Sequence, residues 1–171
     1  MIPGWIIALL TFPGVMLHEL SHKLFCDFFH VPVYEVKYFQ LKGDESGYVK
    51  HGKPKTFVQT FWIAVGPLVL NSLCCFALAG FTIQAKEDSY LQNALIWLSI
   101  SAGMHAFPSS HDADHILVAS KAARASGGSM LHLLTYPFVE LIDMANGLRL
   151  FWFDAFYTAG LFYLGKQLLG S

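Results

Sequence analysis

Residues 2–29, IPGWIIALLTFPGVMLHELSHKLFCDFF, decide how the rest of the chain is interpreted. No charged residue lies between Ile2 and Leu17, and a helical pattern continues to about Phe29. A helix of that length extends about 42 Å, at about 1.5 Å per residue. Because the hydrocarbon layer of a bilayer is about 30 Å thick, this stretch predicts a first membrane-spanning helix whose far end leaves the hydrocarbon.

The composition also differs from that of an average soluble domain. Of the 171 residues, 54% are hydrophobic and 13% are charged, whereas about 25% are charged in a typical soluble domain. We therefore expect residues 1–171 to form a single membrane-embedded domain with the lipid bilayer as a partner. The net charge of −1 excludes the basic excess of a protein that binds nucleic acid. The three cysteines lie in apolar stretches, where buried thiols are expected.

Further segments have the length and apolar character of membrane helices. We therefore expect an all-α polytopic membrane protein with about four to five transmembrane helices. The expected helices after the first one are residues 56–85, 89–107 and 148–168. Residues 130–147 carry a polar stripe and would either span the membrane with that stripe against protein or lie in the interface.

The segment between the first two expected spans has a different character. Residues 33–42 and 48–51 are rich in Val, Tyr and Phe and flank a polar turn bounded by glycines. This pattern predicts a small β-hairpin. The same region holds most of the lysines, and lysine-rich loops face the cytoplasm. We therefore expect a multi-pass protein whose functional site lies toward the cytoplasmic side.

The sequence His18-Glu19-Leu20-Ser21-His22 carries the clearest chemical signal. On a helix, side chains four residues apart lie on one face, so both imidazoles can bind one metal ion. Glu19 is then placed to act as the general base that takes a proton from an attacking water. Zinc suits such a site because it accepts histidine and carboxylate ligands and keeps one position open. Gly14, one turn earlier, would let another segment approach closely.

A hydrolytic zinc site usually has three protein ligands, and the remaining candidates lie together in residues 105–115. We expect Asp112 to be the third ligand, because a helix that begins near Ser110 places it in the first turn. Asp114 would point about 200° away on that helix, where it could orient a zinc-bound imidazole. The alternative ligands in this segment are Asp114 itself and the three histidines His105, His111 and His115.

With these motifs the chain resembles the site-2 protease family of intramembrane zinc metalloproteases. The resemblance covers about residues 1–125, a metalloprotease-like core, and leaves 126–171 as C-terminal membrane helices. It implies that His18, His22 and an Asp bind zinc and that Glu19 activates water. It also implies a substrate that is a transmembrane helix of another protein. The matching features are the HExxH motif, the hairpin after it, Gly66-Pro67, and Pro108 followed by Asp112.

The chain departs from the family pattern at three points. His105-Ala-Phe-Pro108 replaces Asn-x-x-Pro, Asp112-Ala or Asp114-His replaces Asp-Gly, and Asn71 is one residue later than in Gly-Pro-x-x-Asn. These differences indicate a small, divergent member.

The expected function is a membrane-embedded zinc metalloprotease that hydrolyses peptide bonds of membrane-associated or transmembrane substrates. One alternative is a non-catalytic metal-binding membrane chaperone or adaptor of the same fold, against which the intact Glu19 argues. The other is a metal-ion transporter, whose ligands usually lie near the middle of the membrane in related halves of the chain. We see no internal repeat of that kind.

Overall fold

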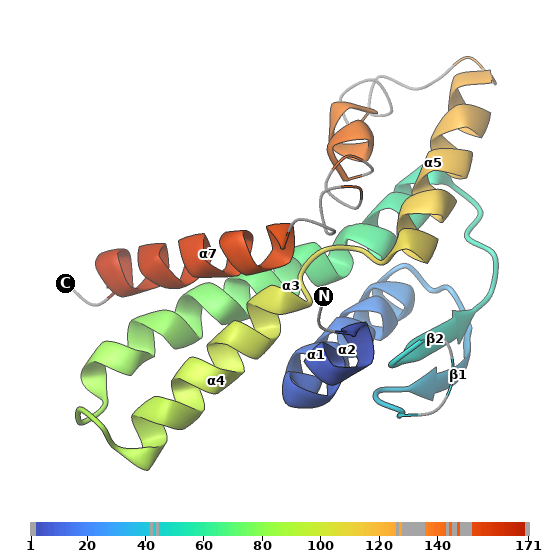
Figure 1. The fold of residues 1–171 in the computed structure, drawn as a ribbon. Helices are drawn as coiled ribbons and strands as arrows, with labels where there is room; N and C mark the ends of the chain where they lie inside the picture. The colour runs from blue at the N-terminus through green and yellow to red at the C-terminus, as the bar shows by residue number, and fades with distance from the viewer. Residues whose placement is uncertain are drawn as a thin grey trace.

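The computed structural model describes residues 3–41, 43, 45–125, 127, 136–142, 144, 147 and 152–169. Within these residues the chain is mostly helical and contains one two-stranded antiparallel sheet (Figure 1). The elements, in chain order, are α1 (Gly4–Leu10), α2 (Phe12–Phe28), β1 (Val33–Lys37), β2 (Tyr48–His51), α3 (Phe57–Gln84), α4 (Tyr90–Met104), α5 (Ser110–Ala125) and α7 (Phe153–Leu169).

Helix α3 is the central element, because it contacts α2, α4, α5 and α7. Its N-cap is Thr56, whose hydroxyl accepts a hydrogen bond from the backbone N–H of Gln59, while the Gln59 side chain accepts one from the backbone N–H of Thr56. This reciprocal cap satisfies two donors that a helix start otherwise leaves free. In Figure 1, α4 and α7 lie along its C-terminal half, and α5 lies near its beginning.

Two glycines set the distances between the helices around α2. A Cβ atom on Gly14 would lie 1.8 Å from the carbonyl oxygen of Ser101, so α2 and α4 touch backbone to backbone. A Cβ atom on Gly66 of α3 would lie 2.4 Å from the ring of Phe25 on α2. The close approach that the sequence predicts at Gly14 is therefore present. Both contacts bring α3 and α4 against the helix that carries the HExxH motif.

Helix α5 is fixed to the beginning of α3 by an apolar cluster. Phe61, Ala64 and Val65 of α3 pack with Ala113 and Ile116 of α5, and all five side chains are buried. Burial of apolar area of this kind contributes about 25 cal/mol per Å². The cluster fixes the first turn of α5, and with it Asp112, relative to α3.

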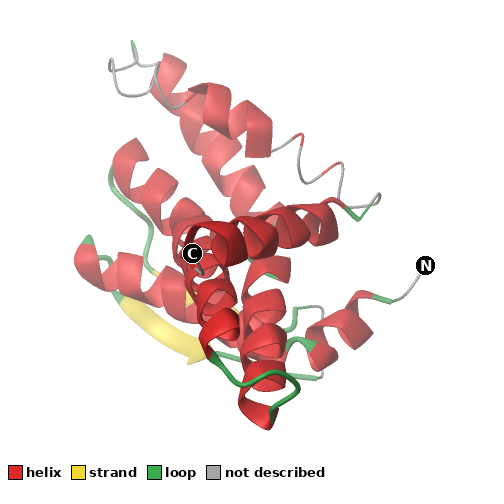
Figure 2. Cartoon of the chain, turned by 90° about the vertical axis from the view of Figure 1, so that its left-hand side faces the viewer, coloured by secondary structure: helices red, strands yellow, loops and turns green. Residues whose placement is uncertain are grey.

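The predicted hairpin is confirmed. Strands β1 and β2 pair antiparallel, with Val36 opposite Val49 and an irregularity near the start of β1. An ion pair of 2.8 Å joins Glu35 Oε2 to Lys50 Nζ on the exposed face. The strands lie at the edge of the helical part of the molecule, where both contact α2 (Figures 1 and 2).

The expectation of a polytopic membrane protein with four to five transmembrane helices is wrong. In the described part of the chain, only α3 is long and apolar enough to cross a membrane, with a bent pair formed by α1 and α2 as a second candidate. The two helices of that pair meet at an angle of 90°. Helices α4 and α7 have 15 and 17 residues, fewer than the roughly 20 that a span needs.

The error comes from equating an apolar run with one straight helix. The uncharged run from Ile2 to Leu17 crosses the end of α1 at Thr11, where the chain turns into α2. The run predicted as residues 148–168 begins its helix only at Phe153. Half of the predicted segment 130–147 lies outside the described residues.

Candidate metal centre

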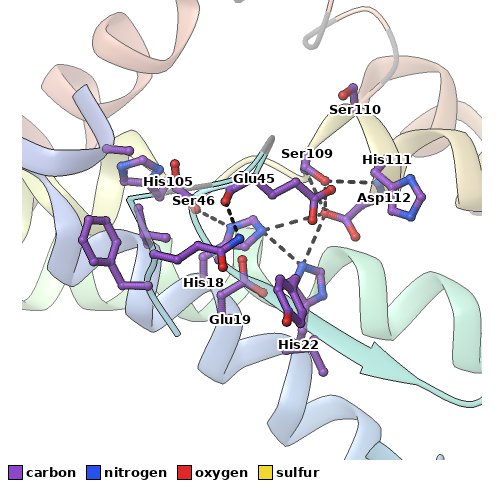
Figure 3. A pocket seen from close by; sticks show the side chains of 18 of the residues that line it. His18, Glu19, His22, Glu45, Ser46, His105, Ser109, Ser110, His111 and Asp112 are labelled. Carbon is purple, nitrogen blue, oxygen red and sulfur yellow. Dashed lines mark hydrogen bonds and ion pairs between the residues drawn. The ribbon is translucent and has the colours of Figure 1, made fainter. Parts of the chain in front are cut away.

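Three side chains converge between α2 and α5. His22 Nε2 lies 3.1 Å from His18 Nε2 and 3.3 Å from Asp112 Oδ2, and His18 Nε2 lies 3.8 Å from the same oxygen. Figure 3 shows the two imidazoles of α2 directed at the Asp112 carboxylate, with Glu19 beside them. In the described residues these three form the one group of at least three candidate ligands close enough to hold a metal ion.

The spacing of these atoms fits zinc. Tetrahedral zinc with bonds of about 2.0–2.1 Å to nitrogen and oxygen separates its ligand atoms by about 3.3 Å. The three observed separations lie between 3.1 and 3.8 Å. Two imidazoles and one carboxylate are also a donor set that catalytic zinc uses, with the fourth position open.

Backbone carbonyls fix both imidazole rings. His18 Nδ1 donates to the carbonyl of His105 at 2.8 Å, and His22 Nδ1 donates to the carbonyl of Ile63 at 2.9 Å. A carbonyl only accepts, so in both rings Nδ1 carries the proton and Nε2 faces the shared point. Bonds of this kind orient metal-binding histidines and raise their basicity.

Asp112 is placed by the start of α5. Its Oδ2 accepts hydrogen bonds from the backbone N–H of Ser109 at 2.9 Å and from the Ser109 hydroxyl at 2.6 Å. The same hydroxyl accepts from the backbone N–H of Asp112 at 3.2 Å. This is a capping box with Asp in place of Glu. The local sequence at the helix start therefore aims the carboxylate at α2.

Burial and neighbouring charges act in opposite directions on the ionisable side chains of the group. Burial opposes ionisation of Asp112, yet the adjacent His22 and His18 hold the pKa of its carboxyl well below the usual range. Burial also opposes protonation of His22, but Asp112 and Glu19 raise the pKa of its imidazole to about 9. Burial lowers the pKa of His18. The carboxylates thus favour positive charge at this point, which a divalent cation supplies.

Glu19 lies beside the group and is not one of its three members. Its side chain is buried, and burial raises the pKa of its carboxyl to about 7. The turn of the hairpin covers it: a Cβ atom on Gly47 would lie 2.7 Å from Glu19 Cγ and 3.0 Å from the carbonyl oxygen of Tyr38. Only a residue without a side chain fits between these two neighbours.

An open cavity of about 730 Å³ surrounds the group. Its walls come from α2, the hairpin turn and the start of α5, and they include His18, Glu19, His22 and Asp112. A concave site of this size with a few convergent polar groups is typical of a binding site for small molecules or peptide segments.

Asn71 is a residue whose role sequence reasoning missed. Its side chain is fully buried in α3, and Nδ2 lies 3.1 Å from the carbonyl of Gly14, 3.3 Å from that of Ala102 and 3.0 Å from that of His105. The amide therefore ties α2, α3 and α4 together next to the carbonyl that holds His18. An Asn within a long apolar run was the available signal, because a buried amide needs partners.

The other candidates of residues 105–115 are not members of the group, although the three histidines line the cavity around it. The His105 ring is bonded through Nε2 to the Thr11 hydroxyl at 2.7 Å, so this residue reaches the site through its backbone carbonyl. His111 and His115 are exposed, with ring centroids 4.3 Å apart, and Figure 3 places His111 beyond Asp112 from the two imidazoles of α2. Asp114 is exposed and is not part of the group.

Comparison of the chain with protein-family models, with curated proteins and with solved structures finds no significant match.

Proposed function

We propose that the protein is a zinc-dependent endopeptidase, with His18, His22 and Asp112 as metal ligands and Glu19 as the general base. One observation carries the proposal: three ligand atoms at zinc-like separations lie beside a buried carboxylate that is not one of them. A site that only stores or carries a metal has no need of that fourth group.

Zinc bound by these three residues would polarise a peptide carbonyl and acidify a bound water. Glu19 takes the proton of the attacking water and returns it to the leaving amine. A pKa of about 7 suits both steps, because the carboxyl exchanges a proton readily near neutral pH. The carbonyls of His105 and Ile63 keep the two imidazoles oriented during the reaction.

The proposal extends to substrates at a membrane surface, because of the character of α3. The most apolar stretch of this helix is only 44% buried within the molecule, and Leu73 and Phe81 are more than half exposed. A bilayer would cover this apolar surface. Because lysine-rich loops face the cytoplasm, residues 31–55 and the site beside them would face that side. Release of the chain from membranes at alkaline pH would contradict this part of the proposal.

The test pairs Glu19→Gln with the matched control Glu87→Gln, which changes an exposed carboxylate in the turn after α3. Each purified chain is assayed for zinc content and for cleavage of a mixture of internally quenched peptides. We expect Glu19→Gln to keep zinc and to lose at least 100-fold in kcat, and Glu87→Gln to match the parent chain. Full cleavage by the zinc-loaded Glu19→Gln chain would refute the proposal.

A further inference from the structure

A second cavity, of about 750 Å³, adjoins the metal centre. It lies between the loop that follows β2, the beginning of α3 and the outward face of α5. His51, Asp112 and His115 line both this cavity and the one around the metal centre. The two cavities therefore meet at the carboxylate that we assign as a metal ligand.

Because the two cavities meet, a peptide bound at the metal centre would also reach the second cavity. An extended chain advances about 3.3 Å per residue, and its side chains alternate between two sides. A peptide with its scissile carbonyl at the metal centre therefore brings a side chain one to three residues away to the second cavity. Asp112 lines both cavities, so only a thin layer of protein separates them at this point.

The walls define the chemistry that the second cavity accepts. Its apolar part includes Ile63 on α3 and Ala119, Ala122 and Ala123 on α5, and it is completed by Pro54, Phe57, Ala64 and Val118. The three alanines of α5 have short side chains, which leaves room for a larger apolar side chain from a partner.

The mouth of the cavity is positively charged rather than apolar. Lys53 and Lys55 lie there, and both are exposed. Among the ion pairs of the described residues, neither ammonium group takes part in one. Cations at the rim of an apolar cavity favour an acidic group next to the inserted side chain.

We infer that this second cavity is a substrate subsite that takes an apolar side chain flanked by an acidic residue. The inference rests on the proposed peptidase function and adds a sequence preference to it.

The experiment measures peptide binding separately from cleavage. The probes are fluorescent glycine-rich peptides that carry one Leu, Phe or Gly next to one Glu or Lys, bound to the zinc-loaded Glu19→Gln chain. Ala119→Trp fills the cavity, and Ala125→Trp, at the exposed end of α5 outside the cavity, is its control. Zinc content shows that each variant keeps its fold around the metal centre.

We expect Ala119→Trp to weaken binding of the Leu–Glu and Phe–Glu peptides at least tenfold and to leave the Gly peptides unchanged. The double change Lys53→Glu with Lys55→Glu should reverse the preference for Glu over Lys, whereas Lys86→Glu should not. Equal affinities of all probes for Ala119→Trp and Ala125→Trp would overturn the subsite. If binding follows the prediction but the parent chain cleaves none of the bound peptides, the peptidase proposal fails and the binding site stands.

Discussion

Replacement of Gly14 by Ala tests the contact that brings α4 to the metal centre. The new Cβ atom would lie 1.8 Å from the carbonyl oxygen of Ser101 and 2.9 Å from His105 Cδ2. Carbon and oxygen atoms that are not bonded rarely approach within about 3.4 Å, so α2 and α4 must separate by about 1 Å or more. Overpacking of this kind typically costs about 1–3 kcal/mol. For a chain of this length, that corresponds to a fall in Tm of roughly 2–12 °C.

The same movement displaces the carbonyl of His105, which holds His18 Nδ1. Loss of such an outer partner weakens metal binding by about 10–100-fold. The assay is thermal unfolding of the metal-free chain, followed by zinc titration of the folded chain.

Gly160→Ala is the matched control. Gly160 lies inside α7 and is exposed, and a Cβ atom added there would meet no atom of another segment within 4 Å. There the change should raise stability by about 0.5–1 kcal/mol, because Ala is the better helix former. The two Gly→Ala changes are thus expected to have opposite signs. A Gly14→Ala chain with parental Tm and zinc affinity would refute the backbone contact between α2 and α4.

Three further predictions concern the centre itself. Asp112→Ala should lose bound zinc and Asp114→Ala should keep it, as measured by metal content after dialysis; retention by both would assign the ligand elsewhere. His105→Ala should keep zinc, because its backbone carbonyl remains, and loss of zinc would show that its ring is needed. Gly47→Ala should keep zinc and lower kcat about tenfold or more, because the added methyl displaces Glu19; an unchanged kcat would contradict the packing of the hairpin turn on that carboxylate.

The parts of the centre that sequence predicts are those set by local periodicity. The i, i+4 spacing places His18 and His22 on one face of a helix, and a helix start near Ser110 places Asp112 in its first turn. The structure brings these three residues together, although their metal-binding role stays a prediction. Gly47 and Asn71 act through contacts with segments distant in the chain, which local spacing does not encode.

The number of membrane spans could not be predicted from the sequence in this way. Hydropathy averages over residues and does not record the direction of the chain, so it misses the break at Thr11, which Pro13 in the first turn of α2 marks. The hairpin was predictable because its signal is local: β-branched and aromatic runs on both sides of a glycine-bounded turn. Helix α3 was predictable for the same reason, since its run has matching ends at Thr56 and Ala85.

The central claim is that two imidazoles and one carboxylate hold a single zinc ion. X-ray absorption at the zinc edge of the zinc-loaded chain tests it most directly. We predict two imidazole nitrogens and oxygen ligands at about 2.0–2.1 Å, with no sulfur, and the loss of bound zinc in His22→Ala, which removes one of the three ligands. A sulfur ligand at about 2.3 Å, which would have to come from one of the three free cysteines, or a spectrum unchanged in His22→Ala would contradict the claim.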